Sequence, residues 1–103
     1  MATKIPSPKS EGCEMLALHL RAAGIGFRRE YKFHPERKWR LDFILSRWLA
    51  VEVEGGVYVQ GRHNRGAGME ADLIKYNAAL LCGFRVLRFS TDQVTYTATG
   101  NIA

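Results

Sequence analysis

Three acidic side chains interrupt two apolar stretches of this 103-residue chain. Asp42 lies in Arg-Leu-Asp-Phe-Ile-Leu, and Glu52 and Glu54 lie in Val-Glu-Val-Glu-Gly-Gly. Short apolar runs of this kind predict buried strands, and a buried charge is costly unless it is paired or bound to a metal. Carboxylate oxygens are ligands that Mg²⁺ prefers. The pattern therefore indicates a cation site at which a phosphodiester group can also bind.

The turn between the two stretches decides which side chains face each other. A two-residue turn at 46–47 would set Asp42 opposite Val51 and mix acidic with core positions. A three-residue turn over 46–48 keeps the apolar faces together and places Glu54 on the same side as Glu52. We predict the second register, with the following opposed pairs: Leu45 and Leu49, Phe43 and Val51, and Asp42 and Glu52.

The remaining elements follow from hydrophobic periodicity and from helix start and stop signals. Ser10 is the expected cap of the first helix and Gly24 its expected stop, while Ile74, Ala78 and Leu81 form the expected apolar stripe of the second. We predict a flexible tail over 1–9, helices over 10–23 and 70–82, strands over 27–33, 40–45, 48–54 and 84–89, and a polar loop over 55–69. The order predicts one α/β domain over 10–103, with a mixed central sheet flanked by helices and a parallel pairing of strands 51–54 and 84–89.

The charge balance favours a polyanionic partner such as nucleic acid. Lys and Arg outnumber Asp and Glu by 15 to 10, for a formal charge of +5. Within the glycine-rich loop, Arg62 and Arg65 are candidate phosphate contacts, because guanidinium groups match phosphate oxygens. His63 is a candidate general acid, base or phosphate contact, with a plain surface histidine as the alternative.

Other features limit the class of protein. No apolar run approaches the roughly 20 residues of a membrane span, and the first residues lack the apolar core of a signal peptide. Two cysteines, Cys13 and Cys82, do not make a disulfide framework. We therefore expect a cytoplasmic protein without a membrane partner.

Taken together, these motifs resemble the PD-(D/E)XK nuclease superfamily, and in particular its small very-short-patch-repair-like branch of phage and bacterial endonucleases. The likeness covers about residues 10–90: a helix carrying Glu14, the two acidic strands, a second helix, and Gly-Phe-Arg-Val-Leu-Arg-Phe. It implies an αβββαβ core, a homodimer, and a DNA endonuclease that uses Mg²⁺, with Mn²⁺ plausible. It also implies that Asp42 and Glu52 bind the metal and that Glu14 is the acid contributed by the first helix.

The chain departs from that family pattern at Glu54, where a lysine usually orients or activates the attacking water. Glu54 could bind a second metal or act as the general base. Lys75, in the second helix, could supply the displaced positive charge and contact the substrate, or be an ordinary solvated lysine. Glu14 is also explained by the helix dipole alone. Tyr76 and Asn77 could support the carboxylates through hydrogen bonds.

The resulting hypothesis is a metal-dependent endonuclease that hydrolyses DNA, with branched, nicked and mismatched DNA as candidate substrates. The alternatives are a nucleic-acid-binding module without catalysis and a subunit of a larger DNA-processing assembly. Trp39 and Trp48 could stack on bases, although core packing or a dimer contact explains each equally simply.

Overall fold

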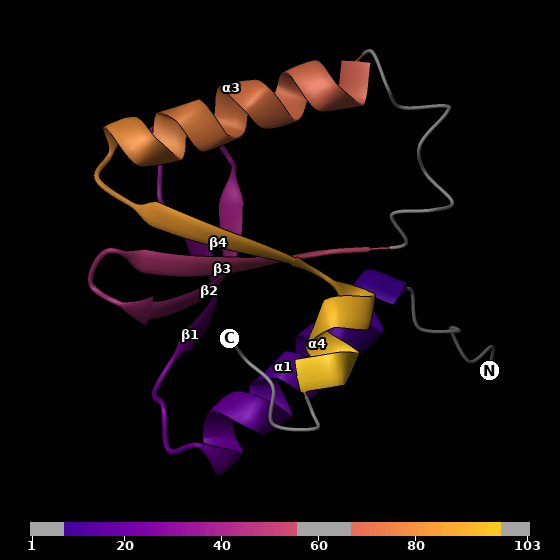
Figure 1. The fold of residues 1–103 in the computed structure, drawn as a ribbon. Helices are drawn as coiled ribbons and strands as arrows, with labels where there is room; N and C mark the ends of the chain where they lie inside the picture. Colours follow the sequence, from indigo (N-terminus) through magenta and orange to yellow (C-terminus); the bar gives the residue numbers. More distant parts are fainter. Residues whose placement is uncertain (1–7, 56–66, 98–103) are drawn as a thin grey trace, which may run out of the picture.

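The computed structural model describes residues 8–55 and 67–97, which form a four-stranded sheet with helices on both faces (Figure 1). The helix α3 lies on one face, and α1 and α4 lie together on the other. The elements are α1 (Pro8–Ala22), β1 (Arg28–Lys32), β2 (Arg40–Ser46), β3 (Leu49–Glu54), α3 (Ala67–Leu81), β4 (Arg85–Ser90) and α4 (Thr91–Thr97).

The sheet has the order β1-β2-β3-β4 and is mixed, as the sequence predicted. The strands β1, β2 and β3 pair antiparallel, and β3 pairs with β4 in parallel. Phe43 lies opposite Val51, which confirms the centre of the predicted register. The predicted pairing of Leu45 with Leu49 is wrong, because a bulge at Leu45 sets Ser46 opposite Leu49 and leaves a two-residue turn over 47–48. The extra residue, Leu45, still packs on the core between the sheet and α1.

The two central strands are buried on both faces, so the molecule has two hydrophobic cores. Between the sheet and α1 lie Cys13, Leu16, Ala17, Leu20, Phe43, Val51, Val53 and Val94. Between the sheet and α3 lie Phe33, Leu41, Ile44, Ala50, Ala79 and Phe84. Leu41 lies two residues before Phe43 in β2, where alternation along a strand would place both on one face, yet it belongs to the other core. Continuous apolar runs are typical of strands that are covered on both sides.

Helix α1 begins at Pro8, so Ser10 lies inside it and is not its cap. Proline is well suited to the first helical turn, where its missing N–H leaves no bond unmade. Gly12 lies so close to the sheet that an added Cβ would come within 2.7 Å of Val53 Cγ1 and Thr91 Oγ1. Gly24 has φ +75° and ends the helix, as predicted.

The apolar stripe predicted for α3 is wrong at two of its three residues. Ile74 and Leu81 are exposed, as is Leu80, whereas Ala78 packs on the core and Ala79 is buried against the sheet. The helix packs through its alanines because small side chains let it approach the strands closely. The larger apolar side chains are left on the outside.

Over the described residues, no helix is long and apolar enough to cross a bilayer.

Helix α4 was not predicted, although its start signal was present in the sequence. The amide of Gln93 donates to Ser90 Oγ at 3.1 Å, and the amide of Ser90 donates to Gln93 Oε1 at 2.9 Å. This reciprocal pair is a capping box with glutamine in the third position. Val94 then buries its side chain against α1. This short threonine-rich helix therefore completes the core between the sheet and α1.

Candidate active site at the end of strand β3

Asp42 and Glu52 lie side by side at the end of the β2–β3 pairing. Both are buried, with 6% and 1% of their surface exposed. The Asp42 amide donates to Glu52 Oε2 at 2.5 Å, and the Val53 amide donates to Asp42 Oδ2 at 2.8 Å. Each carboxylate therefore accepts a backbone N–H from the opposite strand, which fixes both acids in position. The sequence prediction that they face each other agrees with these crossed bonds.

Helix α3 supplies two donors to the second oxygen of Glu52. Lys75 Nζ lies 3.1 Å from Glu52 Oε1, and the Tyr76 hydroxyl donates to the same atom at 2.6 Å. Burial raises the pKa of Tyr76, and its hydrogen bond to Glu52 raises it further. Tyr76 therefore remains a protonated donor at neutral pH. Asn77, considered with Tyr76 from the sequence, is exposed.

Helix α1 supplies a second lysine, which the sequence had placed in the tail. Lys9 Nζ lies 3.0 Å from Asp42 Oδ2. Burial alone would lower the pKa of Lys9, but the charge of Asp42 and its hydrogen bond outweigh this and raise it. Lys9 follows Pro8, a good first-turn residue, and that signal could have shown that it starts a helix. Each buried carboxylate is thus opposed by one lysine.

Cys13 lies beside this group and is not a candidate nucleophile. Burial raises the pKa of its thiol to about 11, with a further contribution from the charge of Asp42. The reactive form of cysteine is the thiolate, which this environment disfavours. The thiol is therefore part of the core, and the acidic pair carries the chemistry of the site.

Glu54 lies further along β3 and has a different partner. Its carboxylate accepts a hydrogen bond from Arg88 Nε at 2.9 Å, and that guanidinium lies 4.2 Å from the centre of the Tyr76 ring. Arg88 also approaches Asp72 at 3.8 Å. Among the residues that the structure describes, no three His, Cys, Asp or Glu side chains are grouped to hold a metal. Glu54 is therefore not gathered with Asp42 and Glu52 into a three-carboxylate cluster.

The other predicted site residues are dispersed or lie outside the described part of the chain. Glu14 is largely exposed on α1 and pairs with Arg29 of β1 at 2.8 Å, and this hydrogen bond lowers its pKa. Among the described residues, its carboxylate is not grouped with Asp42 and Glu52. Arg62, His63 and Arg65 fall in 56–66, outside the described residues.

The arrangement suits a hard divalent cation. Mg²⁺ is commonly held by one or two carboxylates, retains several waters, and takes substrate phosphate oxygens as further ligands. Asp42 and Glu52 provide two such carboxylates, fixed by backbone N–H groups at adjacent positions. Lys75 provides a cation beside them that can face a phosphate. The donor set therefore fits a two-carboxylate metal site.

Comparison with known proteins gives one informative likeness, and it is a likeness of fold. The chain is similar to a solved structure described as the catalytic domain of the homing endonuclease I-Bth0305I, with a TM-score of 0.63 and 21% sequence identity. The alignment covers 86% of this chain and 84% of that one. No family model and no curated protein matches the sequence. The class defined by the fold is therefore an α/β domain of the kind found in an endonuclease catalytic domain.

Proposed function

We propose that this protein is a metal-dependent DNA endonuclease that hydrolyses phosphodiester bonds. The observation that carries the proposal is the buried pair Asp42 and Glu52, held by crossed backbone bonds with Lys75 against Glu52. A second support is the fold, which resembles the catalytic domain of a homing endonuclease. Buried carboxylates beside lysines on such a fold suit the hydrolysis of a charged phosphodiester.

Each residue of the site has a distinct proposed role. Asp42 and Glu52 would hold Mg²⁺, or Mn²⁺, which when bound lowers the pKa of a water and offsets charge on the phosphate. Lys75 holds a positive charge where a phosphate oxygen would bind. Tyr76 keeps Glu52 in one orientation by donating to Oε1. Glu54 can accept the proton of the attacking water only after it leaves Arg88.

The relation to the PD-(D/E)XK superfamily and to its very-short-patch-repair-like branch remains part of the proposal. Glu54 stands where that pattern has lysine, and Lys75 is the proposed replacement because it reaches Glu52 from α3. Arg62, His63 and Arg65 lie outside the described residues, and they are proposed to contact phosphates from the segment that precedes α3 in the sequence. Glu14 has the least support among the proposed site residues, because its carboxylate pairs with Arg29 of β1 and not with a group of the site.

The proposal is tested by cleavage of plasmid, single-stranded, nicked, mismatched and four-way-junction DNA in Mg²⁺, Mn²⁺ or EDTA. We expect cutting that requires a metal and falls on the order of a hundredfold or more in Glu52→Gln. The matched control is Glu11→Gln, an exposed acid of α1. Equal cleavage by wild type and Glu52→Gln, or equal cleavage in EDTA, would contradict the mechanism.

A homodimer or a larger assembly is a secondary proposal, supported by the outer face of α3. Leu73, Leu80 and Leu81 are 57%, 66% and 87% exposed. An apolar surface on one helix is typical of a contact with another chain. Sedimentation of the wild type beside Leu80→Gln tests this: a dimer converted to a monomer supports it, and a monomer in both cases contradicts the homodimer.

A protein that binds DNA without cutting under any metal would favour the non-catalytic module.

A further inference from the structure

The end of the sheet opposite the acidic pair contains two adjoining hollows around the β2–β3 turn. The larger, of about 610 Å³, is lined by Ser46, Arg47, Trp48, Leu49, Gly83 and Arg85. The second, of about 440 Å³, shares Ser46 and Arg47 with it and also includes Arg28. No carboxylate lines either hollow among the described residues. We call Arg28, Arg47, Trp48 and Arg85 the turn end.

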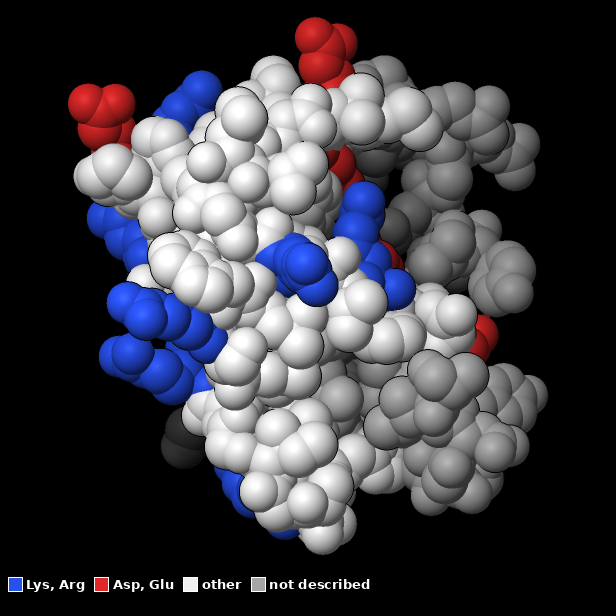
Figure 2. All heavy atoms as spheres, turned by 60° about the vertical axis from the view of Figure 1, so that its left-hand side comes forward, with Lys and Arg blue, Asp and Glu red and all other residues white. Residues whose placement is uncertain are grey.

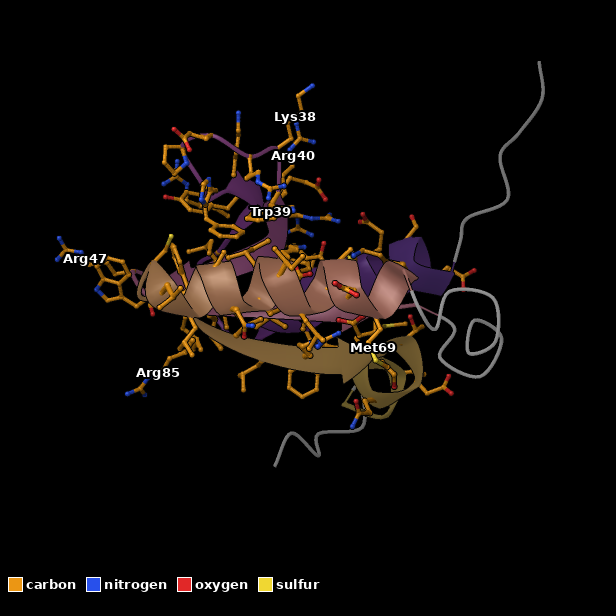
Figure 3. All side chains as sticks on the ribbon, turned by 90° about the horizontal axis from the view of Figure 1, so that it is seen from above. Lys38, Trp39, Arg40, Arg47, Met69 and Arg85 are labelled. Carbon is orange, nitrogen blue, oxygen red and sulfur yellow. The ribbon has the colours of Figure 1, made fainter. Side chains whose placement is uncertain are left out.

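The three arginines of the turn end have no acidic partner among the described residues, whereas three other arginines of the molecule are paired. Arg29 pairs with Glu14, Arg40 with Glu30, and Arg88 with Glu54. No ion pair is formed by the turn-end arginines within the described ranges. Figure 3 shows Arg47 and Arg85 extending away from the molecule at the end where α3 finishes, and Figure 2 shows basic side chains along one margin and across the middle of this side. Unpaired cations gathered in this way favour an anionic ligand.

Trp48 adds an aromatic surface to this positive region. Its side chain is half exposed, at 50%. The ring packs on Phe84, with the ring centres 5.6 Å apart, and Gly83 leaves the space that the ring occupies. A Cβ at Gly83 would lie 3.3 Å from Trp48 Cζ3, in a backbone conformation with φ +99°. The indole therefore packs on Phe84, while the Arg47 guanidinium lies 5.7 Å from the indole centre and half of the side chain remains exposed.

We propose that the turn end binds an unpaired nucleotide of the DNA, with the base stacked on Trp48 and its phosphates on Arg28, Arg47 and Arg85. Aromatic rings bind unstacked bases and guanidinium groups bind phosphates, so the combination suits single-stranded DNA more closely than it suits a continuous duplex. This inference rests on the proposed function, because it adds a substrate class to the same enzyme.

The spacing of the two ends gives the position of that nucleotide. Arg85 lies opposite Leu49, three residues from Glu52 along β3. Three residues of a strand span about 10 Å. Successive phosphates of one strand are about 3.4 Å apart along the axis of a duplex, and an unstacked strand is more extended, so the interval corresponds to at most about three nucleotides. We therefore place the unpaired nucleotide within about three nucleotides of the bond that is cut.

Binding of labelled single-stranded and duplex 20-mers by Asp42→Asn protein tests the contact without cleavage. Removing the three turn-end arginines should weaken single-strand binding about tenfold or more and lower the salt slope by about 2. A matched control removes three unpaired cations from 32–38, where Figure 3 shows Lys38 on a different side. The two triple variants are R28A/R47A/R85A and K32A/R37A/K38A. Equal losses in both would overturn the proposal, since net charge would then explain the binding.

Tryptophan fluorescence tests the stacking separately. The chain has two tryptophans, so Trp39→Phe leaves Trp48 as the sole indole emitter. Phenylalanine should preserve the ring contact that Trp39 makes with Phe33, with centres 6.0 Å apart. We expect single-stranded DNA to quench the Trp48 emission, and Trp48→Leu to weaken single-strand binding more than duplex binding. Tight binding without quenching would overturn the stacking contact.

The outcome separates this inference from the endonuclease proposal. Loss of binding in the turn-end variant supports the inference even if no DNA is ever cut. If the cleavage rate changes neither with the turn-end substitutions nor with the position of an unpaired base, the inference is overturned. The endonuclease proposal would then still stand. A dimer that dissociates in Trp48→Leu without a change in DNA affinity would show that the surface binds a second copy, and would also overturn it.

Discussion

The two ends of the sheet hold their charges in opposite ways. At the end of β3, Asp42 and Glu52 are buried, and each has a lysine at 3.0–3.1 Å. At the β2–β3 turn, three exposed arginines have no acidic partner among the described residues. Groups that must be held in one geometry are buried and paired, because unpaired charge in a core is costly. The turn-end arginines, which we propose bind DNA, remain exposed and have no acidic partner in the described part of the chain. Burial and ion pairing thus distinguish the acidic pair, which is held in one geometry, from the turn-end arginines, whose side chains are exposed.

The largest expected effect comes from removing Glu52. Glu52→Ala leaves Lys75 without its partner and the Asp42 amide and Tyr76 hydroxyl without their acceptor. We expect a loss of about 3–5 kcal/mol in the free energy of unfolding, measured in urea. Glu54→Ala is the control, because Glu54 is partly exposed and its ion pair should contribute less than about 1 kcal/mol. Equal losses would contradict the special position of Glu52.

The paired acids could be predicted from the sequence because their signal is local. Alternation along two neighbouring strands sets which residues share a face, and a short turn limits the register to a few choices. Phe43 opposite Val51 followed from this, and so did the facing acids. The bulge at Leu45 changed the turn without changing that part of the register. Local periodicity was therefore sufficient for the centre of the site.

The partners of the acids could not be predicted in the same way, because they depend on packing between distant elements. Lys9 reaches Asp42 only because α1 begins at Pro8 and lies against β3. The stripe predicted for α3 contained Ile74 and Leu81, which are exposed, yet the helix packs through Ala78 and Ala79. This packing brings Lys75 and Tyr76 to Glu52. Hydrophobicity alone favoured the larger side chains, since it does not account for how closely a helix can approach a sheet.

The next effect separates the two lysines of the acidic pair. Lys75→Met should cost about 2–3 kcal/mol, because Glu52 is 1% exposed and Lys75 only 18% exposed. Lys9→Met should cost less than about 1 kcal/mol, because Lys9 is half exposed and water can replace it. Urea unfolding of the two variants measures the difference. A larger loss in Lys9→Met would contradict the assignment of the more buried pair to α3.

Alkaline pH tests the burial of Cys13 beside the acids. Its folded pKa of about 11 lies above the ordinary 9.0, so the unfolded chain releases the thiol proton first as pH rises. The stabilising contribution is therefore complete below pH 9 and is lost between pH 9 and 11, by up to about 2–3 kcal/mol. Urea unfolding at pH 8, 9, 10 and 11 should show a steeper loss for the wild type than for Cys13→Ala. Parallel curves would contradict the raised pKa.

A smaller effect comes from the close approach of α1 to β3, which brings Lys9 to Asp42. Gly12→Ala should destabilise the fold by about 1–2 kcal/mol, although alanine is the better helix former, because its Cβ would meet Val53 and Thr91 at 2.7 Å. Gly26→Ala is the matched control, since nothing lies within 4 Å of its Cβ position. Thermal unfolding compares the two. A stabilised Gly12→Ala protein would show that α1 is not pressed against the sheet.

The smallest expected effect on stability is at the turn end, and its small size is what makes it informative. R28A/R47A/R85A removes exposed side chains that have no acidic partner among the described residues, so the free energy of unfolding should change by less than about 0.5 kcal/mol per site. Loss of three repelling cations could even stabilise the protein slightly at low salt. Urea unfolding in 20 mM and 500 mM salt measures the change in the free energy of unfolding and the part of it that comes from charge repulsion. If the variant binds DNA poorly while unfolding like the wild type, its arginines serve binding. A loss of stability comparable with that of Glu52→Ala would show instead that they support the fold, and the contrast between the two ends would no longer hold.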